Sequence, residues 1–155
     1  MIRKAEKKDM GAITKLLLQV HEVHAQGRPD IFKPGGIKYD EAELEKVIED
    51  EKNRPVFVYE EDGEVKGYIF CIYEYQEETT NVRGIKTMYI DDLCVDESCR
   101  GQHVGTELYC YAKEVAKKEG CYRMTLHVWE LNPDAAGFYE HLGMKTLMRT
   151  MEEIL

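Results

Sequence analysis

The chain has 155 residues, of which 43% are hydrophobic and 33% charged, and its formal net charge is -9. This length predicts a single domain over residues 1–155 that is large enough to bury a core. The negative charge argues against nucleic acid as a partner, since phosphate binding needs a concentrated basic surface, but it suits a cationic substrate. No apolar run approaches the roughly 20 residues that span a bilayer, and the charged N-terminus lacks a signal-peptide pattern, so we expect a cytoplasmic protein without a membrane partner.

The first half of the chain predicts a strand, two helices and a hairpin. Residues 1–5 suit a short strand, and Asp9 is placed to cap a helix that ends near Gly27. Residues 29–38 contain two prolines and two adjacent glycines and should form a loop, whereas residues 39–52 are acidic and helix-prone. The apolar runs 55–59 and 65–75 flank Asp62-Gly63, a pair typical of hairpin turns.

The second half predicts a strand–helix–strand crossover followed by a short helix. Strand composition returns over residues 85–95, a helix should follow over residues 103–118, and residues 122–129 suit another strand. Asn132-Pro133-Asp134 opens a helix through His141, and residues 144–154 should supply one or two final strands. This order predicts an α/β fold in which a mixed sheet has helices on both faces, with the crossover right-handed.

Cysteine and histidine spacing gives no sign of a disulfide framework or a metal centre. The five cysteines are an odd number without paired spacing, which favours free thiols. His21 and His24 are three residues apart, but no further ligand completes a zinc site, and we expect no metal.

A candidate anion site lies where the strand 85–95 gives way to the helix 103–118. The connecting turn carries Arg100 and Gly101, and the first amides of a helix have no internal partner. Those amides and the helix dipole bind anions well, and glycine lets a phosphate approach the backbone closely. From the residues alone, this turn is either a phosphate cradle or an ordinary strand-to-helix turn.

Three segments resemble the GNAT superfamily of N-acetyltransferases. Arg100-Gly101-Gln102-His103-Val104-Gly105 is similar to the motif Gln/Arg-x-x-Gly-x-Gly/Ala, with His103 where the motif has its first glycine. Residues 132–144 resemble the family segment with Asn, small residues and Phe-Tyr before a turn, and Ile2 to Ala5 with Asp9 resembles its first strand and helix cap. Three motifs in the right order are far more specific than one glycine motif. A non-glycine residue at position 103 is tolerated if its φ is negative, as at a helix start.

The resemblance implies the acyl-CoA N-acyltransferase fold, with a mixed sheet of six to seven strands and about four helices. It implies acetyl-CoA as co-substrate, an amine acceptor, no metal and a possible homodimer. The residues implied to bind acetyl-CoA are Leu93, Cys94, Val95, Arg100, Gly101, Gln102, His103, Val104, Gly105, Thr106, Asn132, Ala136 and Tyr139. Asn132 has an equally good alternative role as the N-cap of the helix that follows it.

The resemblance also implies the catalytic residues. Tyr139 is the first choice for the acid that protonates the leaving thiolate, and Asp91 or Asp92 is the candidate proton acceptor, with a slight preference for Asp91. Side chains alternate along a strand, so one of the two aspartates should face the acceptor and the other should not, and a bulge could change which one does. Alternatively, one carboxylate holds the substrate ammonium. Cys94 has no identifiable partner for a covalent mechanism.

The sequence leaves the acceptor open. By family analogy the walls of its pocket are residues 27–39, 73–78 and 129–131, and Glu74, Glu77 and Glu78 either attract a cation or form a solvated loop. The leading hypothesis is transfer from acetyl-CoA to a small cationic amine in a ternary complex. The alternatives are a protein N-terminal or lysine acetyltransferase and a CoA-binding regulatory domain without catalysis.

Overall fold

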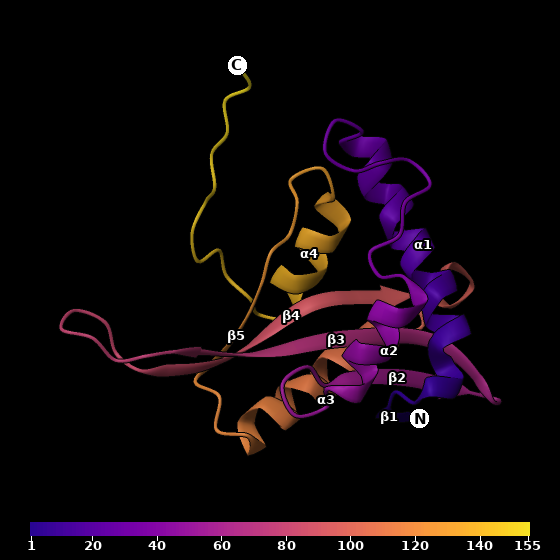
Figure 1. Ribbon diagram of the computed structural model, residues 1–155, viewed down its shortest axis with the longest axis horizontal. Coiled ribbons are helices and arrows are strands. Elements are labelled where there is room, and N and C mark those ends of the chain that lie inside the picture. Colours follow the sequence, from indigo (N-terminus) through magenta and orange to yellow (C-terminus); the bar gives the residue numbers. More distant parts are fainter.

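The computed structural model describes all 155 residues and contains one mixed sheet with four α-helices (Figure 1). None of the helices is both long and apolar enough to cross a membrane. The strands are β1 (Ile2–Lys4), β2 (Val56–Glu61), β3 (Glu64–Gln76), β4 (Ile85–Val95) and β5 (Arg123–Leu126). The helices are α1 (Met10–Gly27), α2 (Glu41–Glu49), α3 (Val104–Lys118) and α4 (Pro133–His141), with short 3-10 turns at Lys7–Asp9 and Glu97–Cys99.

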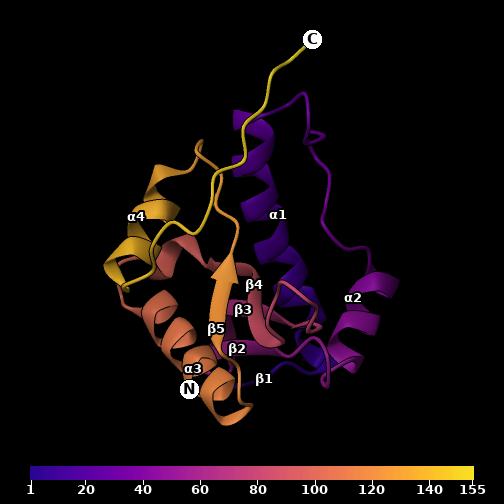
Figure 2. The same ribbon diagram turned by 90° about the vertical axis from the view of Figure 1, so that its left-hand side faces the viewer.

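The strands lie in the sheet in chain order. β1 to β4 pair antiparallel, and β5 pairs parallel to β4. α3 connects these two parallel strands, as the predicted crossover requires. Figure 2 shows α3 and α4 on one side of the sheet and α1 and α2 on the other.

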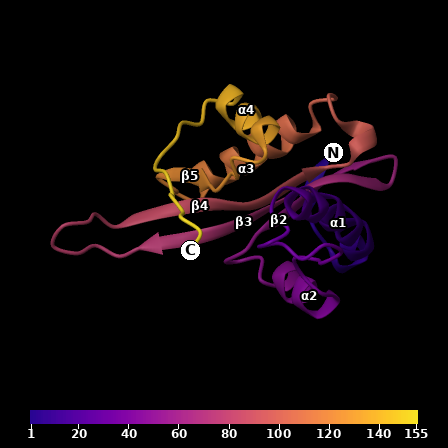
Figure 3. The same ribbon diagram turned by 90° about the horizontal axis from the view of Figure 1, so that it is seen from above.

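Strand alternation divides the core between the two faces of the sheet (Figure 3). On β3, Tyr68 and Phe70 pack with α1 and α2, whereas Ile69 and Cys71 pack with α3. All four side chains are at most 1% exposed. The sheet is therefore the middle layer of three, and β3 and β4 are held rigidly at its centre.

Local signals set two boundaries, of which the hairpin turn was predicted from the sequence. Asp62 and Gly63 have φ values of 51° and 78°, the left-handed pair that a two-residue hairpin turn requires between β2 and β3. At the start of α2, Asp40 accepts a hydrogen bond from the Glu43 amide at 2.8 Å, and the Glu43 carboxylate accepts one from the Asp40 amide at 2.9 Å. This reciprocal capping box fixes where α2 begins.

Asp9 differs from the simple helix cap that the sequence predicts. Its carboxylate makes no capping bond to α1 and instead accepts two hydrogen bonds from Arg3, at 2.7 and 2.9 Å, and one from the Glu6 amide at 2.8 Å. Arg3 also pairs with Glu60 on β2. Asp9 is only 5% exposed, so this ion pair ties β1, the first turn and β2 together.

The predicted final strands are absent, and the sheet has five strands instead of six to seven. Residues 145–155 form neither helix nor strand and make no backbone hydrogen bond. The last such bond joins the Met144 amide to the Tyr139 carbonyl at 3.1 Å. A strand needs a neighbouring strand to satisfy its amides and carbonyls, and the path of this segment brings it beside none.

Candidate active site

The parallel pair β4 and β5 separates partway along its length. Its register runs from Thr87 opposite Arg123 to Ile90 opposite Leu126 and then stops, although β4 continues to Val95. Beyond Ile90, β4 is therefore paired with β3 only. The predicted pantetheine-binding residues Leu93, Cys94 and Val95 lie on this stretch, where one edge of the backbone is free to bind an extended ligand.

A β-bulge at Asp91 changes the alternation expected for the two aspartates. Phe70 lies opposite Asp92 and Cys71 opposite Ile90, so Asp91 is an extra residue without a partner on β3. The carboxylates of Asp91 and Asp92 consequently face the same side, 3.0 and 3.9 Å from the ammonium of Lys38. The expectation that only one would face this side is wrong for that reason.

Asp91 lies at the centre of a polar network built by the loop before α2. Its carboxylate accepts a hydrogen bond from the Tyr39 hydroxyl at 2.8 Å, and its carbonyl accepts one from Lys38 at 3.0 Å. Arg54 donates in turn to the Tyr39 oxygen at 2.8 Å. Burial and the neighbouring Asp91 carboxylate raise the pKa of Tyr39, so this hydroxyl remains a proton donor.

Asp92 is the more deeply buried carboxylate, with a side chain that is 11% exposed. Burial raises its pKa to about 6, and the negative charge of Asp91 contributes in the same direction. Lys38 and a hydrogen bond from the Tyr68 hydroxyl at 3.2 Å oppose the rise. A carboxylate with a pKa near neutrality is suited to accepting and releasing a proton.

The turn between β4 and α3 presents free amides. The amides of residues 103–106 have no hydrogen-bond acceptor within the chain. The first backbone hydrogen bond of α3 is donated by the Glu107 amide to the His103 carbonyl, at 2.9 Å. Gly101 has a φ of 77°, a conformation that favours glycine. The exposed Arg100 is 3.7 Å from Glu97, and Gln102 donates to the Ser98 carbonyl at 3.2 Å. The amides fit a diphosphate at a helix N-terminus.

His103 adopts a backbone conformation that differs from the one expected from the sequence. Its φ is 64°, in the left-handed region, rather than negative. The turn therefore requires the conformation that glycine adopts freely. A residue with a Cβ atom is destabilised there by roughly 1–2 kcal/mol. His103 retains the backbone path of the motif at a local conformational cost.

Gly105 lets α3 and α4 approach closely. A Cβ at this position would lie 3.3 Å from the Phe138 ring and 3.5 Å from Val95. Val104 beside it is buried in the α3 core, whereas Thr106 is half-buried. The contact with Phe138 positions α4, and with it Tyr139, against the end of β4.

Tyr139 packs between Tyr109 of α3 and its neighbour Phe138, with ring centroids 6.4 and 5.1 Å away. Burial raises the pKa of its phenol, and the charge of Asp92 adds to the rise. Tyr139 is therefore protonated at neutral pH and is electrostatically coupled to the same carboxylate that Lys38 faces. Tyr139 packs with the core on the α3 side of the sheet, whereas Asp92 contacts Tyr68 and Lys38.

Asn132 and Ala136 begin α4. The Asn132 side-chain oxygen accepts a hydrogen bond from the Ala135 amide at 3.2 Å, so it is the N-cap, and the Ala136 amide bonds the Asn132 carbonyl at 3.2 Å. The side-chain nitrogen of Asn132 remains available to a ligand.

Cys94 is buried on the face of β4 that packs against α1, and its sulfur lies 3.6 Å from the Leu16 carbonyl. Burial raises the pKa of its thiol to about 12, which makes Cys94 a poor nucleophile.

Two of the three predicted acceptor walls meet near this site. Phe32 of the loop after α1 stacks on His24 at 5.0 Å and contacts Trp129 at 5.3 Å, edge to face. Residues 73–78 do not belong with them, because β3 and β4 extend past the other strands as a projecting ribbon (Figures 1 and 3). Glu74, Glu77 and Glu78 are exposed on this ribbon, as solvated residues would be.

Lys38, Arg54 and Tyr68 carry no signal in the sequence, although all three hydrogen-bond into the aspartate network. Each comes from a different part of the chain, and no spacing relates them to Asp91. Lys38 follows the adjacent glycines 35 and 36, which mark a loop without indicating where it docks. Only the packing of that loop on β4 makes Lys38 part of the site.

Comparison with known proteins agrees with this geometry. A mouse (Mus musculus) thialysine N-epsilon-acetyltransferase is 34% identical over 62 residues, which cover 40% of this chain and 36% of that protein. An uncharacterized N-acetyltransferase of Methanocaldococcus jannaschii is 33% identical over 89 residues, which cover 57% of this chain and 38% of that protein. These matches span well under half the length of the curated relatives.

The solved structures and the family model extend the likeness to nearly the whole chain. The tetramutant of the BH1408 protein from Bacillus halodurans aligns with a TM-score of 0.95 at 29% identity and covers 100% of this chain and 99% of its own. The family model described as Acetyltransferase (GNAT) family matches residues 12–144, a stretch that includes the free amides of α3, the bulge of β4 and Tyr139. This chain therefore belongs to the GNAT family of acetyltransferases.

Proposed function

We propose that this enzyme transfers the acetyl group of acetyl-CoA directly to the primary amine of a small cationic acceptor. Acetyl-CoA supplies an acyl group already activated as a thioester. The free amides of residues 103–106 would hold its diphosphate, and the unpaired edge of Leu93 to Val95 would hold the pantetheine arm. The amine would approach from the side of Asp91 and Asp92.

The ammonium of Lys38 is the observation that carries the proposal. It lies 3.0 Å from the Asp91 carboxylate and 3.9 Å from that of Asp92, at the bulge beside the open edge of β4. Two carboxylates and a main-chain carbonyl thus already bind a primary ammonium within the protein. An acceptor ammonium would make the same contacts after displacing Lys38, whose side chain is 35% exposed.

The two carboxylates suit different roles. Asp91 is held by Tyr39 and is suited to binding the cation, whereas Asp92, with its pKa near 6, is suited to accepting the proton, directly or through water. An alkylammonium is not nucleophilic until it loses that proton. We therefore assign the role of proton acceptor to Asp92 instead of Asp91. Tyr139 would donate a proton to the departing sulfur.

The curated relatives support an amine acceptor. The name of the mouse relative specifies acetylation of the ε-nitrogen of thialysine. Such an acceptor has the same kind of terminal ammonium as Lys38. Because the match covers 40% of this chain, the acceptor itself has to be found by experiment.

A panel of acceptors tests the proposal. Purified enzyme is incubated with acetyl-CoA and polyamines, aminoglycosides, amino acids or peptides, and free CoA thiol is measured. We expect turnover with at least one cationic small amine, and a loss of roughly 10²–10⁴-fold in Tyr139→Phe with CoA affinity unchanged. Tyr122→Phe, at a tyrosine that is 78% exposed on the approach to β5, is the matched control and should retain full activity.

Two results would support other functions. Turnover restricted to peptides would favour a protein lysine acetyltransferase, for which the Lys38 side chain in the site is itself a precedent. Tight CoA binding without turnover of any acceptor would favour a regulatory domain, for which the strained His103 in the cradle is the supporting feature.

A further inference from the structure

Lys38 is held at the open end of β4 by contacts that suit a primary amine. Its ammonium lies 3.0 Å from the Asp91 carboxylate and 3.9 Å from that of Asp92, and it donates a hydrogen bond to the Asp91 carbonyl at 3.0 Å. The pairing of β4 with β5 stops one residue earlier, at Ile90. The Lys38 nitrogen therefore lies against the backbone of β4 where this strand loses its parallel neighbour.

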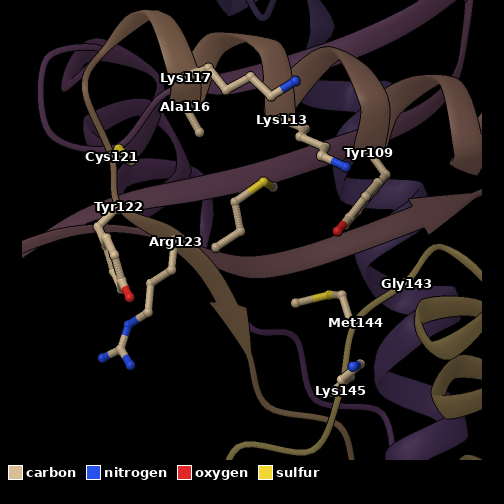
Figure 4. A pocket seen from close by; sticks show the side chains of 11 residues that line it. Tyr109, Lys113, Ala116, Lys117, Cys121, Tyr122, Arg123, Gly143, Met144 and Lys145 are labelled. Atoms are coloured by element: carbon tan, nitrogen blue, oxygen red, sulfur yellow. The ribbon is translucent and has the colours of Figure 1, made fainter.

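A groove on the α3 side of the sheet is less suited to an amine. It has a volume of about 320 Å³ and lies between α3, β5 and residues 143–145 (Figure 4). Its lining contains no carboxylate and four cationic side chains: Lys113, Lys117, Arg123 and Lys145. Like charges repel an ammonium, so the aspartate pair is the better place for an amine, and Lys38 already occupies it.

Side chains alone attach the segment that carries Lys38 to the sheet. Residues 37–39 make no backbone hydrogen bond. Tyr39 docks the segment, because its ring stacks on Phe70 with centroids 5.9 Å apart and its hydroxyl donates to Asp91 at 2.8 Å. The Lys38 side chain is 35% exposed, and its flexible four-carbon stem can turn without disturbing that anchor. Its nitrogen can thus move from the aspartates toward an acyl group beside β4.

We propose that Lys38 is itself an acceptor, and that each chain transfers one acetyl group from acetyl-CoA to its own Lys38 when no external amine is bound. This inference rests on the proposed function, since it uses the same acyl donor and the same two aspartates. An amine and an acyl group held in one site react in an intramolecular step, which is faster than reaction between separate molecules. Lys38 has this advantage over any dilute free amine.

The step balances with acetyl-CoA as the only co-reactant. The Lys38 ammonium loses a proton to Asp92, which passes it to water, and the free amine attacks the thioester carbonyl. A carbon–nitrogen bond forms and the carbon–sulfur bond breaks. The nitrogen loses its second proton, and the departing thiolate gains one from Tyr139. The products are Nε-acetyl-Lys38, free CoA thiol and one proton.

The modification limits itself to one turnover. The nitrogen of an acetylated lysine is neither charged nor nucleophilic, so it cannot react again. Loss of the charge also removes the ion pairs of Lys38 with Asp91 and Asp92. Both carboxylates are then free to bind an external ammonium.

Mass spectrometry tests the proposal. The enzyme is treated with a lysine deacetylase, repurified and incubated with isotopically labelled acetyl-CoA without any amine. We expect one labelled acetyl group per chain, located at Lys38 by peptide mapping, and an equal amount of CoA thiol. Lys33, an exposed lysine of the same loop, is the internal control and should gain label at least about 100-fold more slowly. Lys38→Arg keeps the positive charge and should remove this labelling.

Two further measurements identify the step as intramolecular and place it in the acceptor site. The labelling rate per chain should not change over an about tenfold range of enzyme concentration, as one chain modifies itself. An amine that the enzyme acetylates should slow the labelling of Lys38, because both compete for Asp91 and Asp92. Equal labelling of Lys33 and Lys38, or a rate that rises with enzyme concentration, would overturn the proposal.

Failure of this inference can be told apart from failure of the proposed function. An enzyme that turns over an external amine while Lys38 stays unlabelled would overturn self-acetylation alone. Labelling of Lys38 without turnover of any external amine would support self-acetylation and contradict the small-amine acceptor.

Discussion

Asp91 and Asp92 are adjacent on one strand, yet their surroundings separate their chemistry. Asp91 accepts a hydrogen bond from Tyr39 and an ion pair from Lys38, whereas Asp92 is buried, with its pKa raised to about 6. The bulge that turns both carboxylates to one face makes the pair possible. Two neighbouring acids with different environments are a common basis for dividing cation binding from proton transfer.

The pH profile of the reaction tests the role of Asp92. As a proton acceptor it works only when ionised, so kcat/KM for the best acceptor should rise with pH through an apparent pKa near 6. Asp92→Asn should abolish this limb and lower kcat/KM roughly 100-fold or more. Asp91→Asn should instead raise KM for the amine and keep the limb. A limb that survives in Asp92→Asn would assign it to another group.

The same pKa makes a prediction for stability. Below pH 3.8 Asp92 is protonated in both the folded and the unfolded state and contributes nothing. As the pH rises from 3.8 to 6, the unfolded state ionises first, so the free energy of unfolding falls by about 3 kcal/mol. Asp92→Asn should therefore be more stable than the native protein at pH 7.5, and the advantage should disappear near pH 3.5 in urea unfolding.

His103 allows a test of backbone strain in the cradle. Its φ of 64° suits glycine, so His103→Gly should raise the free energy of unfolding by about 0.5–1 kcal/mol, once the greater freedom of glycine in the unfolded chain is deducted. His103→Ala keeps the strain and should bring no such gain. Thermal unfolding of the three proteins compares them, and equal stability of the glycine and alanine variants would argue against strain.

At the scale of elements, ion pairs and glycine contacts fix how the parts of the site lie. Arg3 joins β1 to the first turn through Asp9 and to β2 through Glu60. Gly105 sets the distance between α3 and α4 and so the position of Tyr139. Neither contact touches the proposed substrates, but both determine where the reacting side chains stand.

Asp9→Asn tests the link between β1 and the first turn. Burial alone would raise the pKa of Asp9, but hydrogen bonds from Arg3 and the Glu6 amide hold it below its ordinary value. Arg3 keeps its second partner, Glu60, so losing the charged hydrogen bonds to Asp9 should cost about 1.5–3 kcal/mol near pH 7. Because a lowered pKa stabilises only while the acid is ionised, the difference should shrink as the pH falls below 3.8.

The control for this substitution is Lys4→Ala, which removes an exposed pair with Glu51 and should cost under about 1 kcal/mol. Chemical denaturation over a range of pH measures both variants. Equal losses in the two would show that the buried pair carries no special weight.

At the scale of the whole molecule, a net charge of -9 favours the approach of a cation. If the acceptor is a cationic amine, its KM should rise roughly threefold to tenfold between about 0.05 and 0.5 M salt, because the Debye length shortens severalfold over that range. Steady-state kinetics at several ionic strengths provide the test, with kcat expected to change little. A KM that does not respond to salt would argue for a neutral acceptor.

Segments with strong local signals were predictable from the sequence. The hairpin follows from Asp62-Gly63, the crossover from the change of period between residues 85–95 and 103–118, and the start of α4 from Asn132-Pro133. The motifs also indicated Asp91, Asp92 and Tyr139, and the catalytic roles of these residues stay predictions. Each of these features depends on neighbours in the chain, where backbone preference and capping act.

The sequence by itself thus determined the layered α/β fold, the family and the turn with free amides, because periodicity, capping and turn chemistry are local. Tertiary structure alone decided that both aspartates face one side, that Lys38 lies between them and that His103 adopts a positive φ. It also decided that residues 145–155 find no strand partner in their own chain. Strand register, loop docking and burial depend on residues far apart in sequence, and no local pattern records them.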